Sequence, residues 1–313
     1  MNNKKNKFLP FIIFLMIFIF NGCATIVYKT IPLRNIAKAK GPYFVGTQDF
    51  QIVDASRKMW FSGNIKGFRK LSVKMWYPAD NIASLKKAPY LNKHKLIGSA
   101  ISKLFGVPEA LMDRAGGVKC NSWLNAVPAN GKFPIIIYSH GHQSIKIANT
   151  SQAEEMASNG YIVVAMDHSY DAALTILDED KIIYSRSKLP ANDEEALQDS
   201  MIQRVKNQLK IRTEDVSFVI DELKIMFEKD NRFSKVADFD NIGIFGHSFG
   251  GCTSIMSAYN DTRIDAVLGL DTYFLPLPKE IFKKDLDKPF VHLGQVSWGD
   301  SDNYEVMSEL GKS

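Results

Sequence analysis

The residues best suited to chemistry lie in one short stretch, Gly246-His247-Ser248-Phe249-Gly250. An apolar run that ends at Phe245 precedes this stretch, and a helix-compatible run follows it. A serine at the apex of a strand-turn-helix bend is held in a strained conformation, and glycines two residues before and after it let strand and helix approach closely. The N–H groups of the helix then point at developing negative charge. The pattern predicts Ser248 as the nucleophile of an acyl-transfer reaction.

The elements around the motif, more than the motif itself, make this prediction specific. With Gly and Ser each at about 7% of residues, a bare G-x-S-x-G occurs by chance in roughly one chain in ten of this length. The apolar strand pattern before it and the helical pattern after it lower that chance by about an order of magnitude.

Asp271 is the candidate acid of a catalytic triad. It stands 23 residues after Ser248 and follows an alternating apolar run, Ile264–Leu270, that predicts a strand. A carboxylate at the carboxyl end of such a strand can orient the imidazole of a catalytic histidine and stabilise its cation. The alternative is an aspartate that caps a loop or a helix.

A second glycine-containing turn, at 139–142, supplies the candidate oxyanion hole. The β-branched run Phe133–Tyr138 predicts a strand buried on both faces of a parallel sheet, and Ser139-His140-Gly141-His142 follows it. Ligands meet such strands at their carboxyl ends, so we expect the backbone N–H groups of His142 and Phe249 to hold an oxyanion. Histidines two apart can also bind zinc, but no third ligand follows at suitable spacing, and we expect no metal.

The remaining patterns predict an α/β domain with a mostly parallel central sheet and helices on both faces. Asp167 and His168 end a predicted strand, and we expect them to hold a loop together. The predicted elements are strands at 71–77 (ended by Pro78), 161–168 and 288–294, helices at 90–113 and 149–159, and a long amphipathic helix or a broken pair at 193–228.

The N-terminus has the pattern of a bacterial lipoprotein signal. Lys4, Lys5 and Lys7 precede a 13-residue apolar run, Phe8–Phe20, that is too short to span a bilayer comfortably. Gly22-Cys23 then resembles a lipobox. We expect a signal peptide over 1–22, a lipid anchor at Cys23 and a tether over 23–40, in a membrane-anchored protein of the bacterial cell envelope. An uncleaved anchor or an ordinary secretory signal is the alternative.

Two basic segments leave a membrane role open. Residues 24–40 carry four cations and no acid, which suits either anionic headgroups or a solvated linker. The basic amphipathic stretch 90–113 suits a membrane surface, a cover over an active-site mouth, or simply a face packed on the core. The net charge of +5 is modest, and the sequence contains no nucleic-acid module, nucleotide loop or cofactor motif. A Cys120–Cys252 disulfide and the oligomeric state stay open.

Taken together, these residues resemble the platelet-activating factor acetylhydrolase family, plasma and type II, within the α/β-hydrolase superfamily. The likeness covers roughly residues 41–300 and rests on motifs at matching spacing. These include Trp76-Tyr77-Pro78, Tyr138-Ser139-His140-Gly141, Met156–Val163, Gly246–Gly251 and the Leu270-Asp271…Phe274…Pro276-Leu277 segment. The resemblance implies a calcium-independent, cofactor-free serine esterase that acts on short or oxidised sn-2 acyl groups of phospholipids. It implies Ser248 as nucleophile, Asp271 as acid, and His142 and Phe249 as oxyanion donors.

The catalytic histidine is where the sequence departs from the family. In the family it follows one further strand, several tens of residues after the acid. Here 42 residues follow Asp271, and His292 is the only histidine among them. His292 falls in an apolar strand pattern, so we expect it to pack rather than act as the base. We expect a domain, 41–313, that is incomplete at its C-terminus and lacks its last strand and helix. A general short-chain esterase or polyester hydrolase, and a catalytically silent lipoprotein, are the alternatives.

Overall fold

The computed structural model describes residues 36–109, 112, 116–190, 195, 198–278, 280–281, 286–296, 303 and 305–307. Cys23, the signal peptide and most of the tether lie outside this range. The chain forms two compact units. One comprises Met1–Ile36 with Pro89–Lys119, and the other comprises Ala37–Ala88 with Cys120–Ser313. The second unit contains all the residues that the sequence analysis assigned to the reaction.

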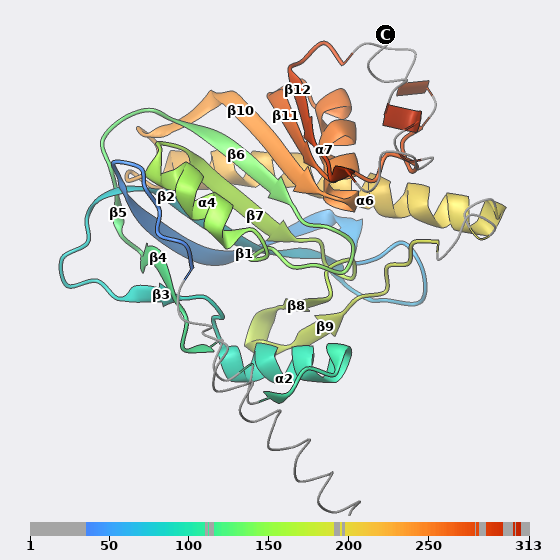
Figure 1. Cartoon of the computed structure of the whole chain (residues 1–313), viewed down its shortest axis with the longest axis horizontal. Helices are drawn as coiled ribbons and strands as arrows, with labels where there is room; N and C mark the ends of the chain where they lie inside the picture. Colours follow the sequence, from blue (N-terminus) through green and yellow to red (C-terminus); the bar gives the residue numbers. More distant parts are fainter. Residues whose placement is uncertain are drawn as a thin grey trace, which may run out of the picture. The chain divides into compact units, whose positions relative to one another are not determined.

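A 10-stranded sheet runs through the described residues in the order β12-β11-β10-β6-β7-β2-β1-β4-β3, with β5 paired to β2 (Figure 1). The strands are β1 (Phe44–Lys58), β2 (Phe68–Asn81), β3 (Lys87–Pro89), β4 (Lys119–Leu124), β5 (Val127–Pro128), β6 (Phe133–Ser139), β7 (Ile162–Asp167), β10 (Ala237–His247), β11 (Ile264–Leu270) and β12 (Phe290–Leu293). A separate two-stranded sheet pairs β8 (Leu174–Ile176) with β9 (Ile182–Tyr184), around the short 3-10 helix Asp178–Asp180.

The strands that position the site are parallel. β6 pairs in parallel with β7 and β10, β11 lies between β10 and β12, and β2 joins the other edge of β7 in the antiparallel direction. All six residues of β7 are buried, which is the reason for its continuous apolar sequence. The predicted α/β class, with a mostly parallel sheet, is confirmed.

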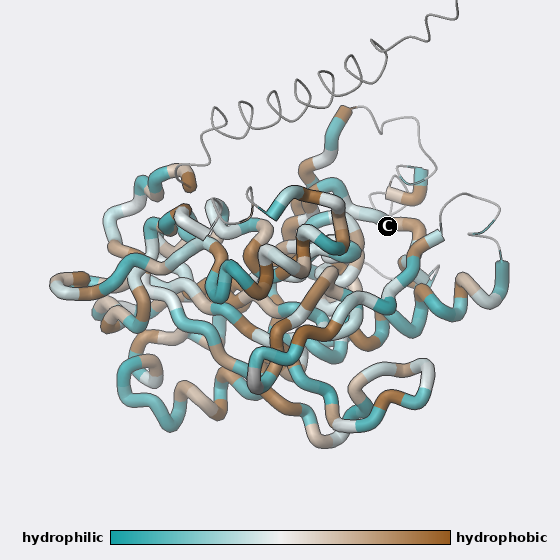
Figure 2. The backbone as a smooth tube through the Cα atoms, turned by 90° about the horizontal axis from the view of Figure 1, so that it is seen from below, coloured by the Kyte–Doolittle hydropathy of each residue, from teal (hydrophilic) through white to brown (hydrophobic). Residues whose placement is uncertain are grey.

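Helices cover both faces of the sheet, as predicted (Figure 1). Three helices of this unit are α4 (Thr150–Ser158), α6 (Asp199–Lys229) and α7 (Phe249–Asn260). Alternate residues of one strand serve opposite faces: Val163 packs in a cluster with Ala153 and Ala157 of α4, whereas Val164 packs in the cluster that contains Val219 of α6 and Ile255 of α7. Apolar and polar segments alternate along α6, as expected of an amphipathic helix (Figure 2).

Three boundaries differ from the predictions. The long helical pattern is one unbroken helix, α6, from residue 199. β2 runs through Pro78 to Asn81, because its other edge stays paired with β1 through Ala79 and the loss of one N–H donor does not end the strand. In the first unit the helix α2 covers only His94–Phe105, and Gly106 ends it in a left-handed conformation with φ 65°.

The thiols of Cys120 and Cys252 are both buried and free, so the disulfide left open by the sequence does not form in this structure. Burial raises the pKa of Cys120 to about 12 and raises that of Cys252 further. No described helix combines the length and apolarity that a bilayer crossing requires. Leu104 and Phe105, at the end of α2, are exposed.

Candidate active site

Ser248 occupies a strained turn between β10 and α7. Its φ of 53° and ψ of −119° lie outside the regions that side-chain-bearing residues normally adopt, and it caps the first turn of α7. A Cβ atom on Gly246 would stand 2.1 Å from the Gly250 carbonyl oxygen, and one on Gly250 would stand 2.0 Å from the Ser139 carbonyl oxygen. Both glycines are therefore required sterically, as the sequence predicted.

The turn after β6 lies directly beside Ser248. A Cβ atom on Gly141 would come within 3.6 Å of Ser248 Cβ. Across the described residues, the amides of His142 and Phe249 donate to no protein acceptor; Phe249 is the first residue of α7, where no intrahelical acceptor exists. The structure thus brings both predicted oxyanion donors to the turns that flank the serine, with their N–H groups unpaired.

Asp271 is held in a segment that is bonded to the serine turn. The Ser248 amide donates to the Leu270 carbonyl at 2.9 Å, and the Ser248 carbonyl accepts from the Tyr273 amide at 3.1 Å. Asp271 itself has a left-handed φ of 44°, and its Oδ1 accepts the Gln295 amide at 2.6 Å. The predicted nucleophile and acid therefore belong to adjoining segments, and the half-buried Asp271 carboxylate is already oriented by a backbone donor.

No histidine nitrogen lies within hydrogen-bonding distance of the Ser248 hydroxyl among the described residues. His292 lies in β12 opposite Gly269, and the burial of β12 alternates so that Phe290 and His292 are half-buried while Val291 and Leu293 are exposed. The predicted placement of His292 within a strand is confirmed. Desolvation lowers the pKa of His292, and the Asp271 carboxylate offsets part of that effect.

A second serine, histidine and aspartate form a hydrogen-bonded chain beneath the site. Ser139 Oγ lies 3.0 Å from His168 Nε2, and His168 Nδ1 lies 3.0 Å from Asp215 Oδ2. All three side chains are fully buried, and Arg69 binds Asp215 through two nitrogens. A substrate cannot reach Ser139, so this chain is structural. Desolvation lowers the pKa of His168 to about 4, which keeps the ring neutral.

The amphipathic pattern of α6 does not reveal this network, because Asp215 lies on the helix face whose other buried residues are mostly apolar. A signal was present: Arg212 and Asp215 stand in phase with Leu209, Val216 and Val219, where a charged side chain must be buried. Asp167 has the structural role that was expected. Its carboxylate accepts both the amide and the ammonium of Lys146, at 2.7 and 2.9 Å, which fastens the far end of the turn after β6.

The H-x-H pair does not form a metal site in the described part of the chain. His140 is fully buried; its Nε2 accepts the His168 amide at 3.2 Å, and desolvation lowers its pKa well below the usual value. The His142 ring is partly exposed, but burial still lowers its pKa. The described residues contain no group of three ligands that could hold an ion.

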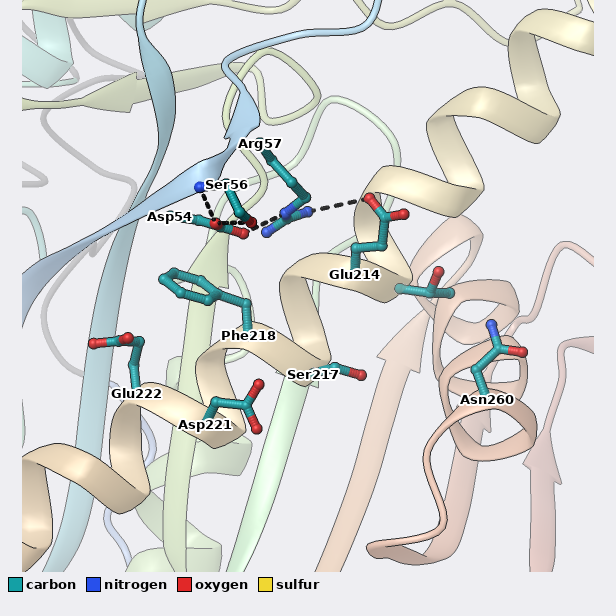
Figure 3. Close-up of a pocket in the computed structure, with 10 residues that line it drawn as sticks. Asp54, Ser56, Arg57, Glu214, Ser217, Phe218, Asp221, Glu222 and Asn260 are labelled. Atoms are coloured by element: carbon teal, nitrogen blue, oxygen red, sulfur yellow. Dashed lines mark hydrogen bonds and ion pairs between the residues drawn. The ribbon is translucent and has the colours of Figure 1, made fainter.

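A separate cavity of about 540 Å³ lies between the end of β1 and the middle of α6 (Figure 3). Arg57 crosses its upper wall between Asp54 and Glu214, and Phe218 forms part of its floor. Asn260, the last residue of α7, also lines it. Ser248 caps the opposite end of that helix, about 18 Å away for twelve residues of rise. The cavity therefore lies apart from the serine.

The strained serine turn between β10 and α7 and the mostly parallel sheet with helices on both faces are those of the α/β-hydrolase fold. Comparison with solved structures agrees. A ferulic acid esterase from Streptomyces cinnamoneus superposes with a TM-score of 0.71 and 26% sequence identity, and the match covers 89% of this chain and 73% of the esterase.

The sequence profile of the family described as "Platelet-activating factor acetylhydrolase, isoform II" matches residues 29–313. The chain belongs to this family. Platelet-activating factor acetylhydrolase from Gallus gallus is 23% identical over 308 residues, which covers 89% of this chain and 70% of that enzyme. The Canis lupus familiaris enzyme is also 23% identical and is covered over 66% of its length. A probable 1-alkyl-2-acetylglycerophosphocholine esterase from Arthroderma benhamiae is 27% identical over 142 residues, or 45% of this chain and 32% of that protein.

Proposed function

We propose that this chain is a serine carboxylic-ester hydrolase that removes short or oxidised sn-2 acyl groups from phospholipids. The observation that carries the proposal is Ser248 in its strained turn, flanked by two unpaired amides and by the segment of Asp271. Family membership and relatives named for acetyl-ester hydrolysis support the substrate class.

In the proposed mechanism the Ser248 hydroxyl attacks the ester carbonyl. The His142 and Phe249 amides stabilise the oxyanion, the alcohol leaves, and water then hydrolyses the acyl-serine. In a serine triad a histidine takes the serine proton and passes it to the leaving alcohol, and Asp271 is the candidate for the acid that orients such a histidine. In the described segments no histidine nitrogen lies within hydrogen-bonding distance of the Ser248 hydroxyl. The mechanism uses no metal and no cofactor.

A general short-chain ester or polyester hydrolase is the neighbouring proposal, because the same serine turn serves many ester pockets. The likeness to a ferulic acid esterase favours it. Relative kcat/KM values for a 2-acetyl phospholipid, p-nitrophenyl acetate and a soluble polyester oligomer separate the two proposals. A preference for the phospholipid of less than tenfold would favour the general esterase.

A protein that binds lipid without turnover is the alternative from another class. The observation in its favour is the missing contact between Ser248 and a histidine in the described residues. Wild-type protein and Ser248→Ala should be compared for release of acetate from a 2-acetyl phospholipid. Equal rates for the two proteins would reject the hydrolase and leave lipid binding.

The N-terminal pattern supports a further proposal, a lipid on Cys23 that anchors the protein at the bacterial cell envelope with its active site at a membrane surface. Cys23→Ala should then accumulate as a larger precursor or be released in soluble form. Mass spectrometry of the wild-type protein is the direct measurement, since an unmodified Cys23 or cleavage at another residue would contradict the proposal.

A further inference from the structure

Arg212 is a fully buried cation in the middle of α6 that binds three separate segments. Its Nη1 pairs with the Asp171 carboxylate, which Ser187 also binds at 3.0 Å. Its Nη2 donates to Ser139 Oγ at 3.0 Å and to the His140 carbonyl. The planar, five-donor guanidinium is what makes these simultaneous contacts possible.

The third segment is the first turn of α7. Arg212 Nε donates to Thr253 Oγ1 at 2.9 Å, and that hydroxyl in turn donates to the Phe249 carbonyl at 2.8 Å. The guanidinium carbon also lies 4.9 Å from the centre of the Phe249 ring, within the range of a cation–π interaction. Arg212 therefore holds the helix turn whose first amide belongs to Phe249.

These contacts reach both segments of the candidate oxyanion hole, namely the turn after β6, which carries the His142 amide, and the first turn of α7, which carries the Phe249 amide. The His140 carbonyl is two residues before the His142 amide, so the bond from Arg212 fixes the peptide from which the turn departs. Asp167 fastens the other end of the same turn through Lys146. The two segments also touch directly, because Gly250 packs against the carbonyls of Ser139 and His140. Small changes in this packing alter the spacing between two amides that must meet one oxygen.

We propose that Arg212 is a positioning residue that sets the spacing of the His142 and Phe249 amides for the transition-state oxyanion. The proposal rests on the proposed hydrolase function. It predicts a loss in kcat with little change in KM, because the charge that these amides stabilise develops only in the transition state.

Arg212→Lys is the principal variant, since it keeps the positive charge but loses the planar guanidinium and its several N–H donors. Arg263→Lys is the control: the half-buried Arg263 also binds an aspartate, Asp261, through two nitrogens and also contacts α6, but it lies beyond the end of α7 that is remote from Ser248. Thr253→Val is a milder second variant, because it removes the hydroxyl that joins Arg212 to the Phe249 carbonyl. Thr253→Ser keeps a hydroxyl and should restore the wild-type kcat.

The measurements are melting temperature, kcat and KM for p-nitrophenyl acetate, and amide hydrogen exchange in peptides that cover residues 138–148. Removal of a whole oxyanion donor costs roughly 10²–10³ in kcat, so a displaced donor should cost about 10–100-fold in Arg212→Lys. Arg263→Lys should keep its kcat within about twofold even if it melts earlier. Exchange over 138–148 should rise in Arg212→Lys and stay unchanged in Arg263→Lys.

Equal kcat values for the two lysine variants, or a rise in KM alone, would overturn the proposal. If the wild-type protein shows no turnover that depends on Ser248, the proposed function fails. The exchange measurement then decides the proposal alone, because unchanged exchange over 138–148 in Arg212→Lys would show that Arg212 does not hold the turn.

Discussion

The Thr272 amide donates a hydrogen bond to Nε2 of His292 over 3.2 Å. A ring nitrogen that accepts a backbone proton cannot itself carry one, so the neutral ring holds its proton on Nδ1. The ring also packs edge-to-face on Phe274, with centroids 5.1 Å apart. His292 therefore supports the two residues on either side of Tyr273, directly after the candidate acid Asp271.

From this contact we predict that His292→Gln lowers stability by ~1–3 kcal/mol, the cost of losing a partly buried hydrogen bond. Esterase activity should be almost unchanged, because the ring supports the loop and does not contact Ser248. Urea unfolding and turnover of p-nitrophenyl acetate measure the two effects. A loss of several orders of magnitude in turnover at an unchanged melting temperature would instead identify His292 as the base.

The serine turn gives a steric prediction with an internal control. A methyl group on Gly250 would meet the Ser139 carbonyl oxygen at 2.0 Å, and backbone cannot move aside easily. We expect Gly250→Ala to cost more than ~3 kcal/mol or to prevent folding. Gly243→Ala, in β10, has its nearest neighbour at 3.8 Å and should change stability by less than ~1 kcal/mol. Similar melting temperatures for the two variants would contradict the packing of the turn.

The buried His168 predicts a loss of stability in mild acid. Desolvation lowers its folded-state pKa to about 4, whereas the unfolded ring titrates near the ordinary histidine pKa of 6.5. The contribution is therefore fully present above pH 6.5 and is lost as the pH falls toward 4, because only the unfolded state gains the proton. Between pH 7.5 and 5 the loss should be ~2 kcal/mol from His168 alone.

His168→Gln is the control for this titration, since it keeps a hydrogen-bonding side chain that does not ionise. Near pH 5, unfolding of the variant should take up about one proton fewer than unfolding of the wild type. The free energy of unfolding of the variant should therefore fall less steeply with decreasing pH, whatever its absolute value. Urea unfolding at pH 7.5, 6 and 5 measures both slopes. Parallel curves for the wild type and the variant would show that His168 is protonated in the folded state.

The parallel core was predictable because burial on both faces leaves a simple trace in the sequence. β6 and β7 consist largely of continuous apolar runs, each followed by a polar or glycine-containing turn. The serine turn was predictable for a related reason, since its glycines are required by contacts within a few residues. Pro78 misled because a proline removes one N–H donor but does not end a strand whose other edge stays paired, and β1 pairs with β2 through Ala79.

The network below the site could not be predicted in the same way. It joins Arg69 of β2, Ser139 of β6, Asp215 of α6 and Thr253 of α7, and no local pattern records those distances. A charged residue within an apolar stripe indicates that a buried partner exists, but it does not identify the partner. The same holds for the unpaired amides of His142 and Phe249, whose proximity depends on the register of β6 against β10.

The last prediction concerns the reactivity of Ser248 itself. Nucleophile and base act as a unit, and loss of such a unit in a serine protease costs on the order of 10⁶ in turnover. The strained turn and both amides are in place, yet no described histidine contacts the hydroxyl. We therefore expect a fluorophosphonate probe to label Ser248 slowly, through the oxyanion hole alone, and not to label Ser248→Ala. Rapid stoichiometric labelling that is abolished in Ser248→Ala would show that this chain supplies a base to the serine.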